Sequence, residues 1–350
     1  MGSRKKTLTL LIGVLSSVVF GYLSFRNFHW EVLRQVLGTI EPFPYLISCS
    51  LWIVDFALRA HRWKYFLPPE RSGTFGSRFS GIVVSYMFNI LLPMRAGDLI
   101  RPAYLVKVNP ISYKVALYSL LLERIYEIII LIIWTLILFK LLTIPRMEYL
   151  SIDLNLLLII ALLGIVFLFT ARRVLISFKT IASRIKLITI ADKVGELVEA
   201  FEANFAFSLR RTMALIALTV AIIFVNGLIY LFIIDSLSIR IPFHGNFLIM
   251  FITVFSFLLP SAPGAIGVFH YFCYLGMMAF GVDATVALSG AIVIHATFAV
   301  IDIGAGALCL IFGPLKLKRL WAERASRGSK TSGRDREMTG GSTGTRTDNR

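Results

Sequence analysis

Charged side chains inside apolar segments are the residues of this chain that could do chemistry. Glu123, Arg124 and Glu127 stand early in an apolar run at 115–139, and Asp302 stands inside another at 284–312. An ionisable group at membrane depth costs roughly 2.5–3.5 kcal/mol, so such groups usually face a bundle interior or a cavity. Glu123 and Glu127 share one helical face. They indicate either a polar wall along a substrate path or an ion cluster that packs helices near the cytoplasmic interface.

A second group of charges surrounds a proline–glycine break. Arg95, Asp98 and Arg101 lie just after Pro93 and around Gly97. A guanidinium group offers a planar fork to phosphate, and a helix N-terminus adds N–H donors and the positive end of a dipole. The spacing therefore favours a site for an anionic group, with plain turn chemistry as the alternative.

The same break recurs later in the chain without charge. The pattern Leu-Leu-Pro-x-x-x-Gly occurs at 91–97 and again at 258–264, an offset of 167 residues. The second copy, which we extend to 267, holds Pro260, Pro263, Gly264 and Gly267. Because it has no ionisable side chain, backbone groups would be its binding elements, unless it too is only a turn.

Further polar positions lie at the ends or in the middle of apolar runs. Asp55 and Arg59 form an i, i+4 pair near the end of one run. We expect Arg59, Arg62 and Lys64 to reach lipid phosphates as snorkelling side chains, with substrate binding as the alternative. Asp302 is the better candidate for an interior partner. His295 lies seven residues before Asp302 and roughly on its face, where it serves either the path or helix packing.

Enzyme motifs are missing from the sequence. It contains no His-Glu-x-x-His, Gly-x-Ser-x-Gly, Walker or dinucleotide pattern. The three cysteines lie in apolar stretches without zinc or disulfide spacing. We therefore expect no catalytic residue, no metal and no cofactor.

Long apolar blocks must position these side chains. Of the 350 residues 57% are hydrophobic and 16% charged, whereas soluble domains are about 45–50% apolar and about 25% charged. Blocks near the roughly 20 residues that cross a bilayer predict an all-α polytopic membrane protein and exclude a soluble enzyme. Six full spans are expected, at 8–25, 43–58, 115–139, 152–170, 212–234 and 284–312.

Two shorter segments end at the breaks. Residues 79–107 and 246–281 are predicted to be re-entrant helical hairpins, because unpaired backbone at membrane depth survives only inside protein or beside water. Matching interrupted segments in two halves are typical of inverted-repeat transporters. Ordinary kinked spans are the alternative.

The distribution of charge supports the hairpins. With a cytoplasmic N-terminus, the predicted inside segments carry a net charge of +20 and hold 30 of the 36 basic residues, whereas the outside loops are close to neutral. This asymmetry follows the positive-inside rule and accounts for the overall +16 without nucleic acid. We expect a multi-pass protein of the inner (cytoplasmic) membrane with both termini in the cytoplasm.

One membrane domain is predicted over residues 1–322, with halves at about 1–140 and 150–315. Residues 172–211 mix apolar and charged side chains at helical spacing, which indicates an amphipathic helix on the cytoplasmic surface. The polar, basic segment 323–350 is expected to be disordered.

Three motifs together resemble the lysylphosphatidylglycerol synthase transmembrane (flippase-like) family. They are Asn89-x-x-x-Pro93-x-Arg95-x-Gly97-Asp98-x-x-Arg101, then Glu123-Arg124, then Pro260-x-x-Pro263-Gly264-Ala265-Ile266-Gly267-Val268-Phe269-His270 with Phe280-Gly281-Val282. The chain departs from the family at Ala265, often glycine, and at His270, often acidic. Because of the second departure, no acidic role can be transferred from the family to position 270.

The resemblance implies an integral membrane protein related to lipid-translocating regions. About 35 residues follow the last predicted span, so the aminoacyl-transfer domain of fused relatives, and its activity, are expected to be absent. The leading hypothesis is a transporter that moves an anionic phospholipid or lipid-linked headgroup between leaflets. A membrane scaffold for cytoplasmic partners and an integral-membrane transferase are the alternatives, and a homo-oligomer is compatible with each.

Overall fold

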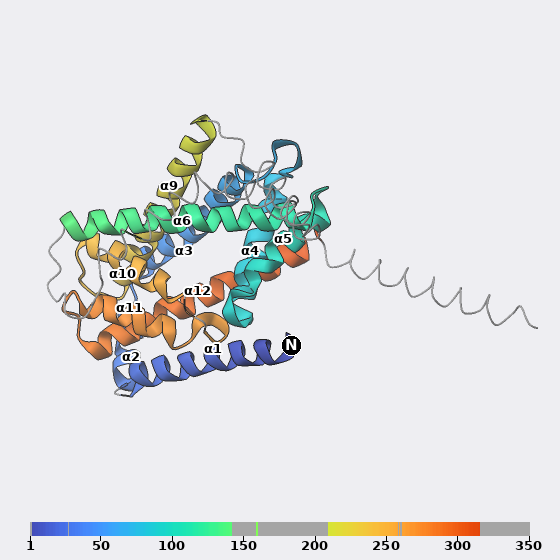
Figure 1. Cartoon of the computed structure of the whole chain (residues 1–350). Coiled ribbons are helices and arrows are strands. Elements are labelled where there is room, and N and C mark those ends of the chain that lie inside the picture. Colours follow the sequence, from blue (N-terminus) through green and yellow to red (C-terminus); the bar gives the residue numbers. More distant parts are fainter. Residues whose placement is uncertain are drawn as a thin grey trace, which may run out of the picture.

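The fold is helical throughout the part of the chain that a computed structural model describes. These are residues 2–26, 28–141, 159, 209–257, 259 and 261–315. They form ten α-helices and no strand (Figure 1). The helices are α1 (Gly2–Phe25), α2 (Trp30–Gly38), α3 (Pro42–Lys64), α4 (Phe75–Leu91), α5 (Gly97–Val108), α6 (Tyr113–Leu141), α9 (Leu209–Ser236), α10 (Phe243–Ser256), α11 (Val268–Met278) and α12 (Ala284–Phe312).

Three helices are long and apolar enough to cross a membrane: α3, α9 and α12. They coincide with three of the six predicted spans. The α1 helix contributes a shorter apolar stretch at Gly13–Phe25, and the 29-residue α6 carries the charges of the 115–139 run. Three predicted segments lie wholly or mostly outside the described residues. They are the span at 152–170, of which only residue 159 is described, the amphipathic segment at 172–211, described only from 209, and the tail at 323–350.

Local signals in the sequence fix where the helices begin and end. Pro42 occupies the first position of α3, where its missing N–H costs nothing. Thr74 caps α4 by accepting a hydrogen bond from the Ser77 N–H, and Asp283 caps α12 by accepting from Thr285 and Val286. Pro93 follows the end of α4 and starts the short 3₁₀ turn η2 (Pro93–Arg95).

Two antiparallel helix pairs flank the breaks. In the first pair, Gly97 at the start of α5 faces Ser85 and Asn89 near the end of α4, and further along Gly81 faces Tyr104. In the second pair, Gly276 of α11 lies against Ile249 of α10. A Cβ at Gly97 would collide with the Ser85 carbonyl oxygen, so glycine lets the chain reverse tightly at this point.

The α12 helix runs past both pairs. Gly290 near its beginning contacts Met277 of α11, and Gly306 near its end contacts Met87 of α4. At 1.5 Å per residue, 29 residues span about 44 Å. The two pairs lie toward opposite ends of the bundle in Figure 1, and the second break meets α12 at His295, in its middle third.

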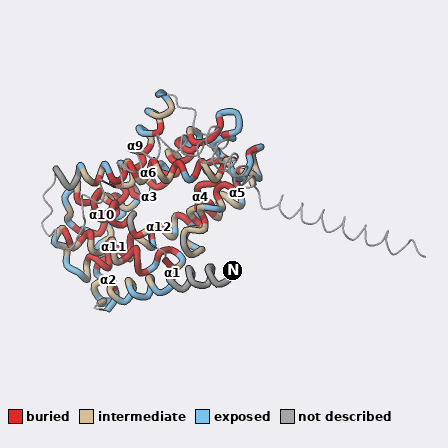
Figure 2. The backbone as a smooth tube through the Cα atoms, viewed as in Figure 1, coloured by how far each residue is buried: buried red, intermediate tan, exposed pale blue. Residues whose placement is uncertain are grey.

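Buried side chains line the faces between the helices, whereas the outer faces expose large apolar groups (Figure 2). Phe43, Val300 and Phe312 are 78%, 72% and 73% exposed. Exposed apolar surface on this scale marks contact with lipid or with another protein, which agrees with helices that cross a membrane.

Candidate functional site

A buried ion cluster joins α3, α5 and α6. The Glu123 carboxylate lies 2.7 Å from an Arg62 nitrogen and 2.7 Å from an Arg101 nitrogen. The Arg62 side chain is fully buried, and the Arg101 guanidinium lies 3.9 Å from the centre of the Trp63 ring. Removing one member of such a cluster leaves an uncompensated buried charge, so this dry centre holds the three helices in register.

Glu127, one turn further along α6, extends the cluster toward α3. Its carboxylate lies 2.8 Å from Arg59 and 2.7 Å from Arg124. Arg59 also bonds Asp55 at 2.7 Å, and the Asn226 amide of α9 donates to Asp55 at 2.6 Å. The shared helical face of Glu123 and Glu127 is confirmed by Arg62, which lies within 4 Å of both carboxylates.

The cluster reaches the first break at Asp98. Its carboxylate lies 3.4 Å from Arg95 and 3.3 Å from Arg124. Asn89 donates an amide hydrogen to Asp98 at 2.9 Å and accepts the Asp98 backbone N–H at 3.1 Å. The Arg95 and Arg124 side chains are 28% and 26% exposed, against 3% or less for Arg62, Arg101 and Glu123.

The cluster therefore has a buried centre and a partly open edge, where the two most exposed side chains are Arg95 and Arg124 and their partners are Asp98 and Glu127. Within the described chain it holds five arginines (Arg59, Arg62, Arg95, Arg101 and Arg124) and four carboxylates (Asp55, Asp98, Glu123 and Glu127). Asp98 is the carboxylate that pairs with both Arg95 and Arg124. The arrangement can accept an anion at Arg95 and Arg124 without disturbing the buried centre.

The structure corrects the prediction that Arg59 and Arg62 reach the lipid headgroups. Both are buried and ion-paired, whereas Lys64 on the same helix is exposed. Two carboxylates one turn apart on α6 need cations in a dry interior, and the inner face of α3 supplies them. The acidic pair in an apolar run indicated that buried cations are needed. The sequence did not show which basic residues would pair with these carboxylates.

The second break is built from backbone and two histidines. Gly264 and Gly267 adopt φ of +67° and +87°, a region that favours glycine. The Gly264 carbonyl oxygen lies 2.7 Å from the His295 Nε2, and the His270 Nδ1 accepts the Gly267 N–H at 3.3 Å. His270 is the third residue of α11, the position from which an acidic side chain closes a capping box, so histidine supplies the acceptor here. Pro260 lies outside the described residues.

The first helix seals the second break from the side. The Ser17 hydroxyl accepts the Ala262 N–H at 2.8 Å, and Gly267 lies directly against Ser17 and Gly21 of α1. With the Ala262 and Gly267 N–H groups and the Gly264 carbonyl already bonded, the described part of this break offers shape more than free hydrogen-bond donors.

The two breaks share part of their backbone geometry, although Gly267 has a positive φ and the corresponding Gly97 does not. The 3₁₀ turn η4 (Pro263–Ala265) corresponds to η2, with a left-handed residue at the third position of each turn: Arg95 at φ +53° and Ala265 at φ +54°. Gly97 and Gly267 follow two residues later, each at the start of a helix. The two 3₁₀ turns thus match at an offset of 170 residues, three more than the 167 of the Leu-Leu-Pro-x-x-x-Gly pattern, because the described turn of the second break starts at Pro263.

The turns η2 and η4 touch each other inside the bundle. The Arg95 guanidinium lies 5.0 Å from the centre of the Phe257 ring, just before the second break. The structure therefore brings Arg95 to the second break and leaves Arg101 in the dry centre. Asp302 forms no ion pair with the cluster in the described chain and accepts a hydrogen bond from the Trp52 indole at 2.8 Å.

Other candidate chemistry is limited in the described residues. They contain no group of three or more His, Cys, Asp or Glu that could hold a metal ion. Sequence reasoning named Glu127, as the partner of Glu123 one turn away, but did not single out Trp63 or Asn226. Neither of these two residues had a visible signal in the sequence.

Residues 10–306 match the family model described as the lysylphosphatidylglycerol synthase TM region. The chain belongs to this family. The matched range contains both breaks and every member of the ion cluster. Comparison with curated proteins and with solved structures finds no match. Family membership and the apolar helices together indicate a membrane protein with a lipid-related function.

Proposed function

We propose that this protein is a lipid transporter that moves an anionic phospholipid, or a lipid-linked anionic headgroup, between the leaflets of the inner membrane. The observation that carries the proposal is the pair of partly exposed arginines, Arg95 and Arg124, at the edge of an otherwise buried ion cluster, beside the contact between the two breaks. The proposed cycle has no covalent step and needs no cofactor.

Arg95 and Arg124 bind the headgroup phosphate in this proposal. Each now contacts the Asp98 carboxylate at 3.3–3.4 Å, and a phosphate offers the same charge with more acceptor oxygens for a guanidinium fork. Phosphate therefore replaces Asp98 as the partner of both arginines. Asn89 keeps the displaced carboxylate through its two hydrogen bonds.

Arg101 has a different role from the one its position in the sequence indicated. Its guanidinium is committed to Glu123 and stacked on Trp63, so it anchors the site without touching the lipid. The second break supplies an uncharged wall through Gly264 and Gly267. Asp302, bonded to Trp52, lies on the α12 side of the path.

The path itself rests on two re-entrant hairpins in an inverted repeat. In support of it, the pairs α4–α5 and α10–α11 lie toward opposite ends of the bundle while their breaks touch. The charge asymmetry of the sequence favours a cytoplasmic location for the α4–α5 end. Rocking of the two halves about the joined breaks would then expose the headgroup site to each side in turn.

Leaflet exchange of labelled anionic phospholipid in proteoliposomes tests the proposal. Wild type should exceed protein-free vesicles, and Arg95→Ala should reduce the protein-dependent rate by at least tenfold. Ala265 holds the same left-handed conformation in the second break, so alanine fits at position 95. Arg95→Lys should fall between, because it keeps the charge and loses the fork.

The matched control is Arg71→Ala, which removes an exposed arginine on the 3₁₀ turn η1 (Pro69–Arg71). It should exchange lipid at the wild-type rate. Equal rates in protein-free, wild-type and Arg95→Ala vesicles would contradict the proposal.

A further inference from the structure

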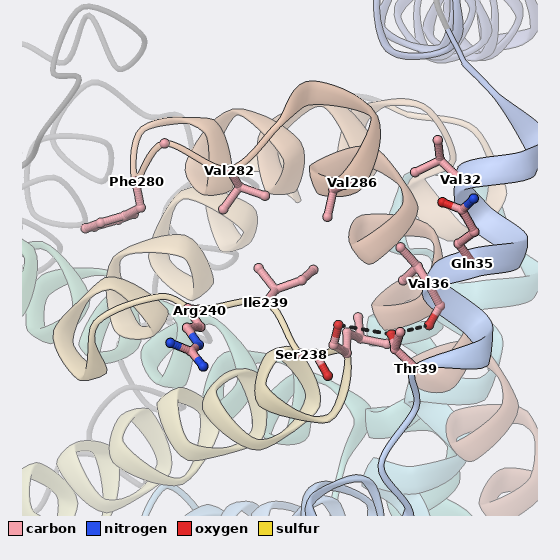
Figure 3. A pocket seen from close by; sticks show the side chains of 12 residues that line it. Val32, Gln35, Val36, Thr39, Ser238, Ile239, Arg240, Phe280, Val282 and Val286 are labelled. Atoms are coloured by element: carbon pink, nitrogen blue, oxygen red, sulfur yellow. Dashed lines mark hydrogen bonds between the residues drawn. The ribbon is translucent and has the colours of Figure 1, made fainter.

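Two adjoining pockets open at the end of the bundle where the α4–α5 pair is absent. Their volumes are about 400 and 420 Å³, and they share Ile239 and Arg240. The first lies between α2, the α9–α10 connection and the α11–α12 connection (Figure 3). These segments are the ones that the charge distribution assigns to the outside of the membrane.

The first pocket is apolar with a polar rim. Figure 3 shows its side chains around an open space, with Arg240 at one end and Gln35 at the other. Its lining includes Phe280, Gly281 and Val282, a motif of the resemblance that the ion cluster leaves unused. Apolar walls with a few placed polar groups are typical of small-molecule sites.

Arg240 is the only cation in the lining of either pocket, and it is exposed. Among the described residues no hydrogen bond or ion pair to its side chain is found, in contrast to the arginines of the ion cluster. Asp235 lines the second pocket with it but forms no ion pair with it in the described chain. An unpaired guanidinium beside an apolar pocket suits the phosphate of an amphiphile.

Asn246 adds an independent observation in the second pocket. Its side chain is buried, at 1% exposure, and its amide nitrogen donates to the Pro242 carbonyl at 3.1 Å. Its Oδ1 has no hydrogen-bond partner in the described part of the chain. A buried acceptor without a donor is costly, so the pocket lacks a hydroxyl or amine that a ligand can bring.

The surroundings match the boundary between lipid and water. Trp30, Phe43 and Phe243, in the segments that flank the pockets, are 72%, 78% and 55% exposed. Aromatic side chains gather at the headgroup level of membranes. A ligand held here would have its polar part among the loops and its apolar part against the lining of the first pocket.

We propose that the two pockets together bind one phospholipid with a hydroxylated, anionic headgroup. Arg240 binds the phosphate, the Asn246 Oδ1 accepts a headgroup hydroxyl, and the start of an acyl chain lies along Val36, Val282 and Val286. This inference rests on the proposed function, which supplies the path between the two leaflets. In that path, the pocket site holds the lipid on the side of the membrane opposite the ion cluster.

A fluorophore in the first pocket can report binding to this site alone. Gln35→Cys, in a chain whose three native cysteines are alanine, carries an environment-sensitive dye in detergent micelles. Dioctanoyl phosphatidylglycerol is the probe, and dioctanoyl phosphatidylmethanol keeps its charge without the hydroxyls. Glycerol phosphate and inorganic phosphate test whether the headgroup or the bare anion is sufficient.

The expected result is saturable binding of phosphatidylglycerol that Arg240→Ala weakens at least tenfold and Arg34→Ala, an exposed α2 position, leaves unchanged. Asn246→Leu should lower the affinity for phosphatidylglycerol to that for phosphatidylmethanol. The site would be overturned if the dye on the wild-type background showed no saturable response to phosphatidylglycerol. It would also be overturned if Arg240→Ala bound this lipid with the same affinity as Arg34→Ala. Binding of inorganic phosphate as tightly as the lipid would overturn it too, because that result would make it a free-anion site.

Leaflet exchange separates this inference from the function on which it rests. Exchange that depends on Arg95 but occurs without pocket titration overturns only the pocket. Pocket titration without any protein-dependent exchange overturns the proposed transport and leaves a lipid site.

Discussion

The two breaks share a proline–glycine turn but differ in glycine conformation and in side-chain chemistry. Each has a proline, a left-handed residue two positions later and a glycine two positions after that. The first carries Arg95 and Asp98 at the positions where the second carries Ala265 and Val268. Charged side chains hold the first break, whereas glycine conformations, histidine hydrogen bonds and the α1 helix hold the second.

This difference shows how one turn can serve two purposes. A proline–glycine break at membrane depth needs its polar backbone satisfied, and both solutions do so. Only the first carries a partly exposed arginine, Arg95, which is why we assign anion binding to that side. The second break contributes an uncharged surface. Substitutions in it should lower the free energy of unfolding more than they change lipid binding.

The largest effect should come from the dry centre behind the first break. Glu123→Gln leaves Arg62 and Arg101 without their shared carboxylate, and breaking a buried ion pair costs about 3–5 kcal/mol. The free energy of unfolding in mixed micelles should fall by that amount. Glu70→Gln, at an exposed position, is the control; equal stability of the two variants would show that the cluster does not hold the helices.

The next largest effect should come from the glycine of the second break. A Cβ at Gly267 would collide with the Ser17 carbonyl oxygen, at a φ of +87°, and a strained backbone alone costs about 1–3 kcal/mol. Gly267→Ala should exceed that range.

Gly281→Ala is the matched control for Gly267→Ala. Gly281 has a φ of +84° and open space around its Cβ position, so only the conformational cost remains. If the two alanine variants unfold at the same denaturant concentration, close packing against α1 is not what fixes this break.

A smaller effect should follow loss of the amide that holds Asp98. Asn89→Ala removes two hydrogen bonds, each worth about 0.5–1.5 kcal/mol, so we expect a loss of about 1–3 kcal/mol. The same substitution should cost clearly less in an Asp98→Ala background, which a double-mutant cycle of unfolding free energies measures. Additive losses would mean that the two side chains act independently.

The smallest effect should be at the helix start that follows the second break. His270→Leu removes the acceptor for the Gly267 N–H, and we expect about 1 kcal/mol of destabilisation from a lost cap. His270→Gln keeps an acceptor at the third helical position and should retain more stability. Indistinguishable unfolding curves for the two variants would refute a capping role.

Much of the site was visible in the sequence, for physical reasons. Charges in apolar runs must find partners, so Glu123, Arg124 and Asp302 were recognisable as interior residues. The proline and glycine positions marked both breaks. The partners themselves came from distant helices, such as Arg62 of α3 and Asn226 of α9, and tertiary packing decides which side chains meet.

The register of the repeat shows a second limit. The Leu-Leu-Pro-x-x-x-Gly pattern aligned Pro93 with Pro260, whereas the turn in the second break starts at Pro263. Two prolines three residues apart offer two places to end a helix. Which one starts the turn depends on packing against α1 and α12, through Ser17 and His295.

The most direct test of the central claim measures the side from which each hairpin enters the membrane. In a chain without native cysteines, Gly76→Cys and Lys107→Cys flank the first hairpin, and Phe243→Cys and Ala284→Cys flank the second, all at exposed positions. A membrane-impermeant maleimide should label the first two from the cytoplasmic side only, and the last two from the opposite side only. Labelling of Gly76→Cys and Lys107→Cys from different sides would show that the first segment crosses the membrane and would contradict two hairpins that meet from opposite faces.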